Sequence, residues 1–307
     1  MKLVILDIQT CSPDDLFING LSDLVEAVAY GYTSPDLIYE RCKDAEMILT
    51  NKTVIDRKLM EQLPRLRYIG VLATGYNVVD IDAAHERGIV VTNIPSYSTM
   101  SVAQMVWAHL LNIVNRVDYY AQQNREGRWC RNQDFCYYDF PHHELDGKVF
   151  GIVGTGNIGR AVARIAEAFG MRVIGVNSKN MNQLPDLLRE SDVVSLHCVL
   201  NDKTKELINS DTLALMKQSA ILINTGRGGL INEQDVADAL NQGRIAAYAA
   251  DVLSVEPPSA DNPLFQAKNS YLTPHIAWAT VEARQRLLHI AIDNIRTFLN
   301  GEERNNV

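Results

Sequence analysis

The fold of this 307-residue chain is decided by the stretch Val149-Phe150-Gly151-Ile152-Val153-Gly154-Thr155-Gly156-Asn157-Ile158-Gly159. Its apolar start, residues 149–153, predicts a buried strand, and residues 157–169 predict a helix. A further apolar run at 172–176 predicts a second strand. A strand, a glycine cluster, a helix and a strand in this order predict a βαβ unit with parallel strands.

The three glycines of this stretch have the spacing Gly-x-Gly-x-x-Gly. In a strand–turn–helix, Gly154 permits the tight turn, Gly156 lets the backbone approach a pyrophosphate, and Gly159 allows close packing of helix on strand. The phosphates would bind N–H groups at the amino end of the helix. The context therefore favours dinucleotide binding over the alternative of a purely structural turn.

The rest of the chain repeats the strand–helix alternation. Before the glycine turn we predict strands at 2–6, 47–50, 68–73 and 89–92 and helices at 34–43, 56–62 and 80–87. After it we predict strands at 172–176, 193–197, 220–224, 246–250 and 271–273 and helices at 182–190, 233–241 and 280–300, with Gly301 as a C-cap. This pattern predicts the α/β class, with two doubly wound parallel sheets that helices cover on both faces.

The middle of the chain departs from that alternation. Residues 101–124 contain no Pro or Gly and have apolar residues at helical spacing, which predicts one long helix. Residues 126–144 are rich in aromatic and polar side chains without a clear period. We interpret them as an ordered excursion that packs onto a partner subunit.

Composition excludes several classes of protein. The length predicts about two domains, and 47% hydrophobic with 21% charged residues is ordinary for a globular protein. A net charge of −8 argues against nucleic-acid binding as the main function. No apolar run approaches the ~18 residues that a membrane span needs.

The cysteines and histidines give no sign of a disulfide framework or a metal. The five cysteines include no Cys-x-x-Cys pair, which fits reduced thiols in the cytoplasm. The adjacent His142 and His143 with Glu144 lack a convergent further ligand, so we expect no metal.

Polar residues follow three predicted strands of the second half. Arg227 follows the strand at 220–224, Asp251 and Glu256 follow the strand at 246–250, and His275 follows the strand at 271–273. The carboxyl ends of parallel strands are where ligands bind in open α/β sheets. We therefore expect these side chains to share one edge of the sheet.

Their chemistry suits reduction of a 2-keto acid. His275 can give a proton to the developing alkoxide, because an imidazole titrates near working pH. Glu256 can accept from the other ring nitrogen, and Arg227 can clamp a carboxylate with two hydrogen bonds. Taken singly, each residue has an ordinary alternative: a surface arginine, a loop glutamate or a packed histidine.

The residues after the strand at 172–176 bear on the choice of nucleotide. An acid usually takes the ribose 2′-hydroxyl of NAD here, but this chain has Asn177-Ser178-Lys179. No carboxylate would repel a 2′-phosphate, and Lys179 can pair with one, so NADP is slightly favoured. The alternatives are that Lys179 is a solvated loop charge and that Asn177 bonds an NAD ribose.

Several motifs together resemble the D-isomer-specific 2-hydroxyacid dehydrogenase family over essentially the full chain. They are residues 73–80 (Ala-Thr-Gly-Tyr-Asn-Val-Val-Asp), 154–159, 195–198 (Ser-Leu-His-Cys), 224–229, 251–257 and 273–275. Within the family, residues 101–104, 135–139 and 273–280 look most like glycerate dehydrogenases, also called hydroxypyruvate reductases.

The resemblance implies a discontinuous, flavodoxin-like substrate domain of residues 1–98 plus 280–307. A Rossmann cofactor domain of residues 99–279 is inserted in it. Residues 101–144 would form the interface of a homodimer. Asn177 in place of the usual acid and Cys198 in place of a common threonine depart from the family pattern, and Cys198 is expected to be a small packing residue beside the cofactor.

The resemblance also implies the roles of individual residues. Arg227, Glu256 and His275 form the expected catalytic set. The expected substrate contacts are Thr74, Gly75, Arg227, His275 and Trp278, where Trp278 either narrows the pocket or only packs against a domain face. The expected cofactor contacts are Thr74, Val102, Gly154, Gly156, Asn157, Ile158, Gly159, Asn177, Ser178, Lys179, Cys198, Thr225, Gly226, Arg227, Asp251, His275 and Ala277, with Asp251 near the nicotinamide amide.

The resulting expectation is an NAD(P)-dependent reductase of small 2-keto acids. Hydroxypyruvate, giving D-glycerate, is the preferred substrate, and glyoxylate is a second one. A dehydrogenase for another D-2-hydroxy acid such as D-lactate is the alternative among enzymes. The alternative from another class is a nucleotide-sensing, corepressor-like binding protein, against which the presence of all three catalytic residue types argues.

Overall fold

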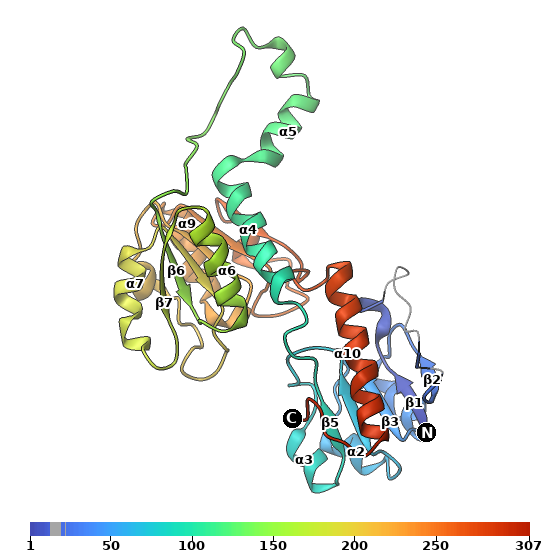
Figure 1. The fold of residues 1–307 in the computed structure, drawn as a ribbon. Helices are drawn as coiled ribbons and strands as arrows, with labels where there is room; N and C mark the ends of the chain where they lie inside the picture. The colour runs from blue at the N-terminus through green and yellow to red at the C-terminus, as the bar shows by residue number, and fades with distance from the viewer. Residues whose placement is uncertain (13–19, 22) are drawn as a thin grey trace. The chain divides into compact units, whose positions relative to one another are not determined.

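The chain forms two compact units in the computed structural model, which describes residues 1–12, 20–21 and 23–307 (Figure 1). Unit 1 consists of Met1–Ser98 and Trp278–Val307, and unit 2 consists of Thr99–Ala277. The sequence placed the second boundary after residue 279. The roles assigned to the two units, substrate domain and cofactor domain, stay predictions.

Unit 1 contains a five-stranded, fully parallel sheet in the order β2-β1-β3-β4-β5. Its strands are β1 (Lys2–Ile5), β2 (Glu26–Ala29), β3 (Met47–Thr50), β4 (Tyr68–Val71) and β5 (Val90–Thr92). The central strands β3 and β4 are buried along their whole length. Strand β2 was missed from the sequence because all four of its residues are exposed at the sheet edge, so no apolar pattern marks it.

Helices cover both faces of this sheet. On one face α10 (Val281–Leu299) packs against apolar residues of β1, β3 and β4. On the other face lie α1 (Ile38–Cys42), α2 (Arg57–Glu61) and α3 (Ile81–Glu86). The sequence predicted α10 closely: Thr280 caps its first turn, and Gly301 adopts the left-handed conformation just after it, with φ of 76°.

Unit 2 contains a six-stranded, fully parallel sheet in the order β11-β10-β9-β8-β6-β7. Its strands are β6 (Val149–Val153), β7 (Arg172–Val176), β8 (Val193–Leu196), β9 (Ile221–Asn224), β10 (Ala247–Ala250) and β11 (Ser270–Leu272). The chain forms β6, then β7 on one side of it, then β8 on the other side. This reversal places a topological switch point between β6 and β8, where the carboxyl end of β6 meets the glycine turn.

The sheet of unit 2 is also covered on both faces. One face packs against α4 (Thr99–Asn115) and α6 (Asn157–Ala168), and the other against α7 (Leu184–Glu190), α8 (Ser210–Leu213) and α9 (Glu233–Asn241) (Figure 1). The predicted α/β class with two doubly wound parallel sheets is confirmed. The short helix α8 was not predicted, because four residues are too few to show a helical period.

The single helix predicted over 101–124 is wrong. Arg116 adopts the left-handed conformation, with φ of 51°, and separates α4 from α5 (Val117–Arg125). Helix α4 buries an apolar face against the sheet, whereas α5 has no buried residue. Beyond this break, α5 and the following chain to residue 140 project from the body of unit 2; we call residues 117–140 the arm (Figure 1).

All five cysteines are free thiols. Burial raises the pKa of Cys11 to about 11 and that of Cys42 to about 12, whereas Cys130 and Cys136 are exposed on the arm. Among the described residues, every helix is too short or too polar to cross a membrane.

In unit 1, the carboxylate of Asp7 joins the end of β1 to the loop after β3. It accepts from the backbone N–H groups of Asn51 (2.7 Å), Lys52 (2.6 Å) and Thr53 (2.8 Å) and from the Thr53 hydroxyl (3.0 Å). Asp7 is 8% exposed, so water does not easily replace it. Loss of an acceptor leaves buried donors unpaired, which costs more than a typical hydrogen bond contributes.

Replacing Asp7 with Ala is therefore expected to lower the free energy of unfolding by about 2–4 kcal/mol. Urea unfolding followed by circular dichroism measures this change. Asp44→Ala is the control, because Asp44 is an exposed acid whose contact with Lys2 is 3.9 Å long, and it should change the same quantity by less than about 0.5 kcal/mol. Equal effects of the two substitutions would contradict the role given to Asp7.

Candidate active site

The glycine turn after β6 has the geometry that its spacing predicts. Gly154 has φ of 105°, and a Cβ there would lie 2.4 Å from the backbone nitrogen of Cys198. A Cβ on Gly159 would lie 2.1 Å from the carbonyl oxygen of Gly154. These two positions accept no side chain, because α6 and the end of β8 approach the turn too closely.

Gly156 differs from its two neighbours in the motif. It is the N-cap of α6, with an ordinary extended conformation, and a Cβ there would meet no atom within 4 Å. Glycine is thus required neither by strain nor by packing at this position. An open space beside the amino end of a twelve-residue helix fits the approach of a pyrophosphate.

Two buried polar atoms near this turn lack a hydrogen-bond partner within the described part of the chain. They are Oγ1 of Thr225, just after β9, and Nδ1 of His197, just after β8. The other ring nitrogen of His197 lies 2.9 Å from the hydroxyl of Ser195, and burial lowers the pKa of His197 to about 4, so the ring is neutral at pH 7. Unpartnered polar atoms at the carboxyl ends of two strands fit a site that a polar ligand completes.

The turn after β7 contains no carboxylate. The side-chain amide of Asn177 donates to the hydroxyl of Thr155 (2.9 Å) and its oxygen accepts from the backbone of Lys179 (3.0 Å). Ser178 and Lys179 are exposed. The structure therefore fixes the backbone of this turn beside the glycine turn and leaves the Lys179 ammonium in solvent.

His275 and Glu256 form a pair at the opposite side of the switch point. Nδ1 of His275 lies 2.6 Å from Oε2 of Glu256, and about one third of each side chain is exposed. The other carboxylate oxygen of Glu256 accepts from the backbone N–H of Leu253 (2.9 Å). An ionised carboxylate only accepts, so the proton of this bond belongs to Nδ1, and Nε2 is the nitrogen left for a ligand.

The backbone around His275 is unusual. His275 itself has φ of 54°, and its N–H donates to the carbonyl of Thr273 (3.0 Å). The carboxylate of Asp251, only 1% exposed, accepts from Ile276 N–H (2.9 Å) and Ala277 N–H (2.7 Å). We call residues 273–277 the His275 turn. Asp251 holds it in a conformation that few non-glycine residues adopt.

Arg227 follows β9 and is exposed, and its guanidinium donates to the carbonyl of Gly226 (2.8 Å). The adjacent Gly228 is packed tightly, since a Cβ there would lie 1.9 Å from the carbonyl carbon of Leu253. The loop that carries Arg227 is therefore fixed against the loop that carries Glu256. The role of Arg227 as carboxylate clamp stays a prediction.

The remaining predicted contacts divide between the units. In unit 2, Val102 and Ala277 are buried, and Cys198 is half-buried, which raises the pKa of its thiol. In unit 1, Thr74 donates its hydroxyl to the carbonyl of Ile94 (2.8 Å). Trp278 is half-buried and packs against the core of unit 1, edge-on to Tyr97 with 6.4 Å between ring centroids. The substrate roles of Thr74, Gly75 and Trp278 stay predictions.

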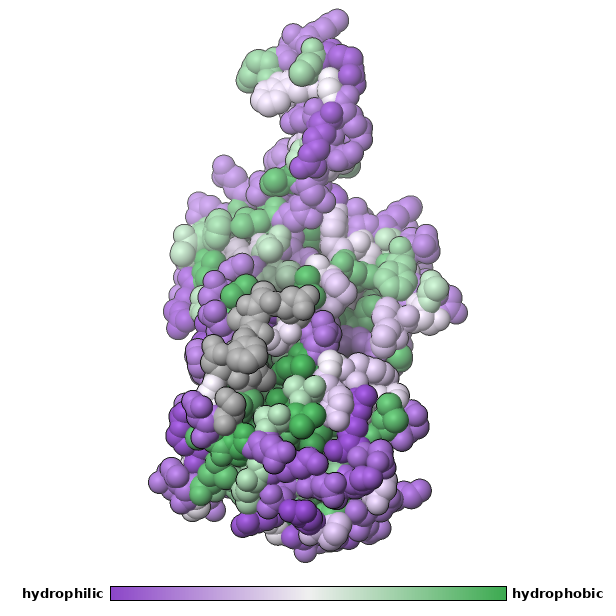
Figure 2. All heavy atoms as spheres, turned by 90° about the vertical axis from the view of Figure 1, so that its right-hand side faces the viewer, coloured by the Kyte–Doolittle hydropathy of each residue, from purple (hydrophilic) through white to green (hydrophobic). Residues whose placement is uncertain are grey.

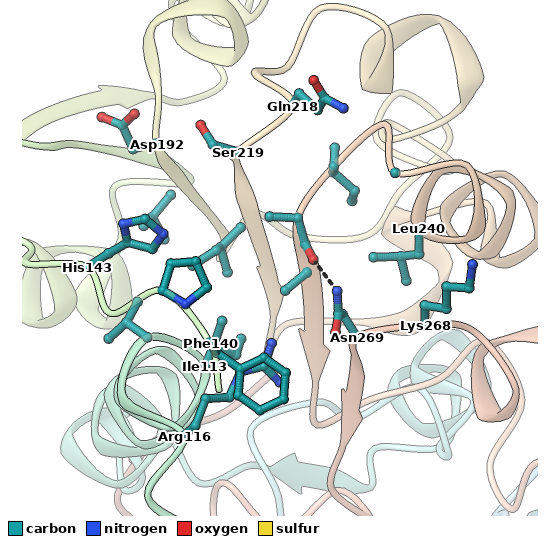
Figure 3. A pocket seen from close by; sticks show the side chains of 18 of the residues that line it. Ile113, Arg116, Phe140, His143, Asp192, Gln218, Ser219, Leu240, Lys268 and Asn269 are labelled. Carbon is teal, nitrogen blue, oxygen red and sulfur yellow. Dashed lines mark hydrogen bonds between the residues drawn. The ribbon is translucent and has the colours of Figure 1, made fainter. Parts of the chain in front are cut away.

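A cavity of about 610 Å³ lies elsewhere in unit 2, at the amino ends of β8, β9 and β10 (Figure 3). Arg116, Phe140 and His143 line it beside the base of the arm. It contains none of the predicted catalytic residues. The candidate active site lies at the carboxyl ends of the strands, because the His275–Glu256 pair and the glycine turn are found there.

Sequence comparison decides the family. The profile of the D-isomer specific 2-hydroxyacid dehydrogenase, NAD binding domain, matches residues 107–277, more than half of the chain. The chain belongs to the D-isomer specific 2-hydroxyacid dehydrogenase family. As a member of that family it is an NAD(P)-dependent dehydrogenase that acts on the CH–OH group of a 2-hydroxy acid or on the corresponding keto acid.

Individual relatives of this dehydrogenase cover nearly the whole chain. It is 46% identical over 314 residues to a hydroxypyruvate reductase of Blautia hydrogenotrophica, covering 98% of each protein. It is 39% identical over 277 residues to a glycerate dehydrogenase of Methylorubrum extorquens, covering 89% of this chain and 88% of the relative.

Solved structures agree with the fold of this dehydrogenase. An acyclic imino acid reductase in complex with NADPH and D-arginine has a TM-score of 0.88 at 30% identity, over the full length of both chains. A D-lactate dehydrogenase of Aquifex aeolicus complexed with NAD and lactic acid has a TM-score of 0.81 at 28% identity, covering 98% of this chain and 96% of the other. A nicotinamide dinucleotide is therefore the cofactor class.

Sequence reasoning missed the residues behind the His275 turn. Ser101 and His109 lie eight positions apart on α4, two turns along one face, and both are buried. Two buried polar residues on an otherwise apolar helix face were the available signal, because such groups need partners.

Gly156→Ala should separate cofactor binding from folding in this dehydrogenase. The new methyl group meets open space, so the melting temperature should stay within about 2 °C, while the affinity for NADPH falls at least about tenfold because the methyl group stands where the pyrophosphate approaches. Fluorescence titration with NADPH measures the affinity. Gly159→Ala is the contrasting variant, since its methyl group would collide with the Gly154 carbonyl and should prevent stable folding. Unchanged NADPH affinity in Gly156→Ala would contradict this placement of the phosphates.

Proposed function

We propose that this dehydrogenase reduces hydroxypyruvate to D-glycerate and accepts glyoxylate as a second substrate. The observation that carries the chemistry is the 2.6 Å contact between His275 and Glu256 at the carboxyl edge of a dinucleotide-binding sheet. The choice of hydroxypyruvate is supported by the 46% identity to a hydroxypyruvate reductase over 98% of each chain. Pyruvate, giving D-lactate, is the competing substrate.

The orientation of the His275 ring determines which of its nitrogens donates the proton. Reduction of a ketone produces an alkoxide that needs a proton. Because Nδ1 is directed to the Glu256 carboxylate, Nε2 of the imidazolium is the donor. Glu256 keeps the ring in this orientation and stabilises its positive charge until the proton leaves.

When bound, the reduced nicotinamide supplies the hydride that C2 of the keto acid receives. Arg227 is proposed to bind the carboxylate of the keto acid. It is exposed and is the first charged side chain after β9, and a guanidinium matches a carboxylate with two parallel hydrogen bonds. Such a clamp orients C2 but does not take part in the proton transfer.

NADPH is proposed as the preferred nucleotide. The turn after β7 carries Asn177 where an acid would repel a 2′-phosphate, and the exposed ammonium of Lys179 is two residues further on. Arg160, in the first turns of α6, donates to the carbonyl of Thr155 (3.2 Å) and to the side chain of Asn157 (2.7 Å), which adds a second cation near the glycine turn. Two cations and no carboxylate favour a phosphate.

Loss of absorbance at 340 nm tests these proposals with NADPH and NADH in parallel, against hydroxypyruvate, glyoxylate and pyruvate. The highest kcat/KM is expected for hydroxypyruvate with NADPH. Higher kcat/KM with pyruvate would overturn the substrate, and higher kcat/KM with NADH would overturn the nucleotide preference alone. Lys179→Ala should lower kcat/KM for NADPH about tenfold and leave that for NADH unchanged.

The catalytic roles are tested on the same reaction. His275→Ala should lower kcat by about 10²–10⁴-fold while NADPH binding persists. Arg227→Lys should mainly raise KM for the keto acid, since a point charge replaces a bidentate clamp. Undetectable turnover of hydroxypyruvate, glyoxylate and pyruvate by the unmodified dehydrogenase would overturn the proposed substrates.

We also propose that the protein is a cytoplasmic homodimer held by the arm. The arm has hydrogen bonds of its own: Tyr137 donates to Asn124 (2.7 Å), and Arg128 pairs with Asp139 (2.6 Å). Yet Phe135 is 89% exposed and Tyr138 is 75% exposed. Figure 2 shows apolar side chains open to solvent on the arm. Exposed aromatic rings that lie close together on a surface are typical of an interface. Free thiols at all five cysteines fit a reducing compartment.

Phe135→Ser combined with Tyr138→Ser is expected to produce a monomer. Both rings are exposed in the single chain, so the substitutions should leave unit 2 folded and remove only contact area with a second copy. Sedimentation velocity measures the state of assembly, and Tyr32→Ser, at a 73% exposed tyrosine outside the arm, is the control that should stay dimeric. A double variant that remains dimeric would contradict an interface at the arm tip.

A further inference from the structure

A group of buried polar side chains lies directly behind the His275 turn. His109 on α4 is 7% exposed, and its Nε2 lies 3.2 Å from the hydroxyl oxygen of Thr273. That hydroxyl lies 2.6 Å from Oδ1 of Asp251. We propose that His109 is a positioning residue that acts through Thr273 and Asp251 on the turn that presents His275; this inference rests on the proposed role of His275 as proton donor.

The directions of these hydrogen bonds follow from the number of protons. The Thr273 hydroxyl has one proton, and its shortest acceptor contact is the Asp251 carboxylate, at 2.6 Å against 3.5 Å for the carbonyl of Ala250. With its proton directed to Asp251, the Thr273 oxygen can only accept from His109. Nε2 of His109 therefore carries a hydrogen, and the order of donation is His109 to Thr273 to Asp251.

The chain of hydrogen bonds matters for the His275 turn because it ends on a buried charge, the carboxylate of Asp251. A carboxylate that is 1% exposed needs full hydrogen bonding. Within residues 1–12, 20–21 and 23–307, its donors all come from the His275 turn: Thr273 Oγ1, Ile276 N–H and Ala277 N–H. If the Thr273 hydroxyl rotates away, Asp251 loses its shortest bond. The left-handed conformation of His275, which lies between Thr273 and Ile276, then loses part of its support.

Helix α4 holds the other side of the turn as well. The hydroxyl of Ser101 donates to the carbonyl of Ala277 (2.5 Å). Ser101 and His109 thus fix the last and the first residue of the His275 turn from one helix face. These two contacts imply that α4, and not the loop sequence alone, sets the position of the His275 imidazole.

A simple packing role for His109 is the competing explanation. Burial lowers the pKa of His109, so its ring is neutral near pH 7, while the nearby Asp251 opposes that shift. A neutral ring has one N–H, which the geometry assigns to Nε2. Packing alone would need only the shape of the ring, whereas positioning needs this donor.

The experiment compares His109→Leu with His109→Gln, both measured below their melting temperatures. Leucine fills space without a donor, whereas the side-chain amide nitrogen of glutamine reaches about as far as Nε2. His109→Leu should lower kcat for the keto acid about tenfold to a hundredfold, with the KM of the keto acid and the Kd of NADPH within about twofold of the unmodified enzyme. His109→Gln should recover most of kcat.

Val106→Ala is the matched control, because Val106 is a fully buried residue of α4 outside this group. It should lower the melting temperature and leave kcat unchanged. Should His109→Leu fail to fold, Thr273→Val removes the acceptor of the His109 bond together with the bond to Asp251, and it should lower kcat at least as much.

Unchanged kcat in the folded His109→Leu or Thr273→Val variant overturns the inference, and so does equal loss in the leucine and glutamine variants, which would indicate packing. These results are separate from a failure of the proposed function. In that case His275→Ala itself would retain turnover.

Discussion

A buried charge organises the candidate active site. The carboxylate of Asp251 is out of contact with solvent, and burying such a group is unfavourable unless hydrogen bonds replace its water. Among the residues that the structure describes, the three donors to this carboxylate all belong to the His275 turn. The requirement that Asp251 be satisfied is therefore also what fixes the backbone beneath the imidazole. In unit 1, Asp7 fixes the loop after β3 in the same way, because its carboxylate accepts four hydrogen bonds from that loop.

The order of the strands explains why the remaining groups meet this turn. Because β7 and β8 lie on opposite sides of β6, the loops on either side of the switch point diverge and leave room for a ligand. Gly154 and Gly159 are consequences of that close approach, since α6 and the end of β8 leave no space for side chains there. Of the three glycines of this motif, only Gly156 has neither strain nor packing that requires glycine, which fits the predicted approach of a pyrophosphate at this position.

The sequence predicts those parts of the molecule that local pattern determines. Apolar runs identified nearly every buried strand, and the capped helix α10 was predicted within one residue at each end. The pattern fails where local and tertiary preferences differ. Strand β2 is exposed at an edge and has no apolar signature, and the break at Arg116 depends on whether the helix beyond it has a surface to cover.

In the candidate site, too, local sequence pattern predicts some residues, and only tertiary packing reveals others. Glycine spacing and residues after strand ends led to Gly154, Glu256 and His275, because the topology of a parallel sheet brings such positions to one edge. The contact of His109 with Thr273 joins residues 164 positions apart. Only the packing of α4 on the sheet brings them together, so no local pattern could have predicted it.

The break at Arg116 has a thermodynamic consequence for the arm. A nine-residue helix without a buried side chain is marginal by itself in water. Its backbone amides should therefore open with a small free energy while the amides of α4 are protected by the core. If a second copy covers the arm, the protection of α5 against hydrogen exchange becomes a function of protein concentration, whereas that of α4 does not. Arg116 then marks the border between α4, which the core of unit 2 stabilises in a single chain, and α5, which contact with a second copy would stabilise.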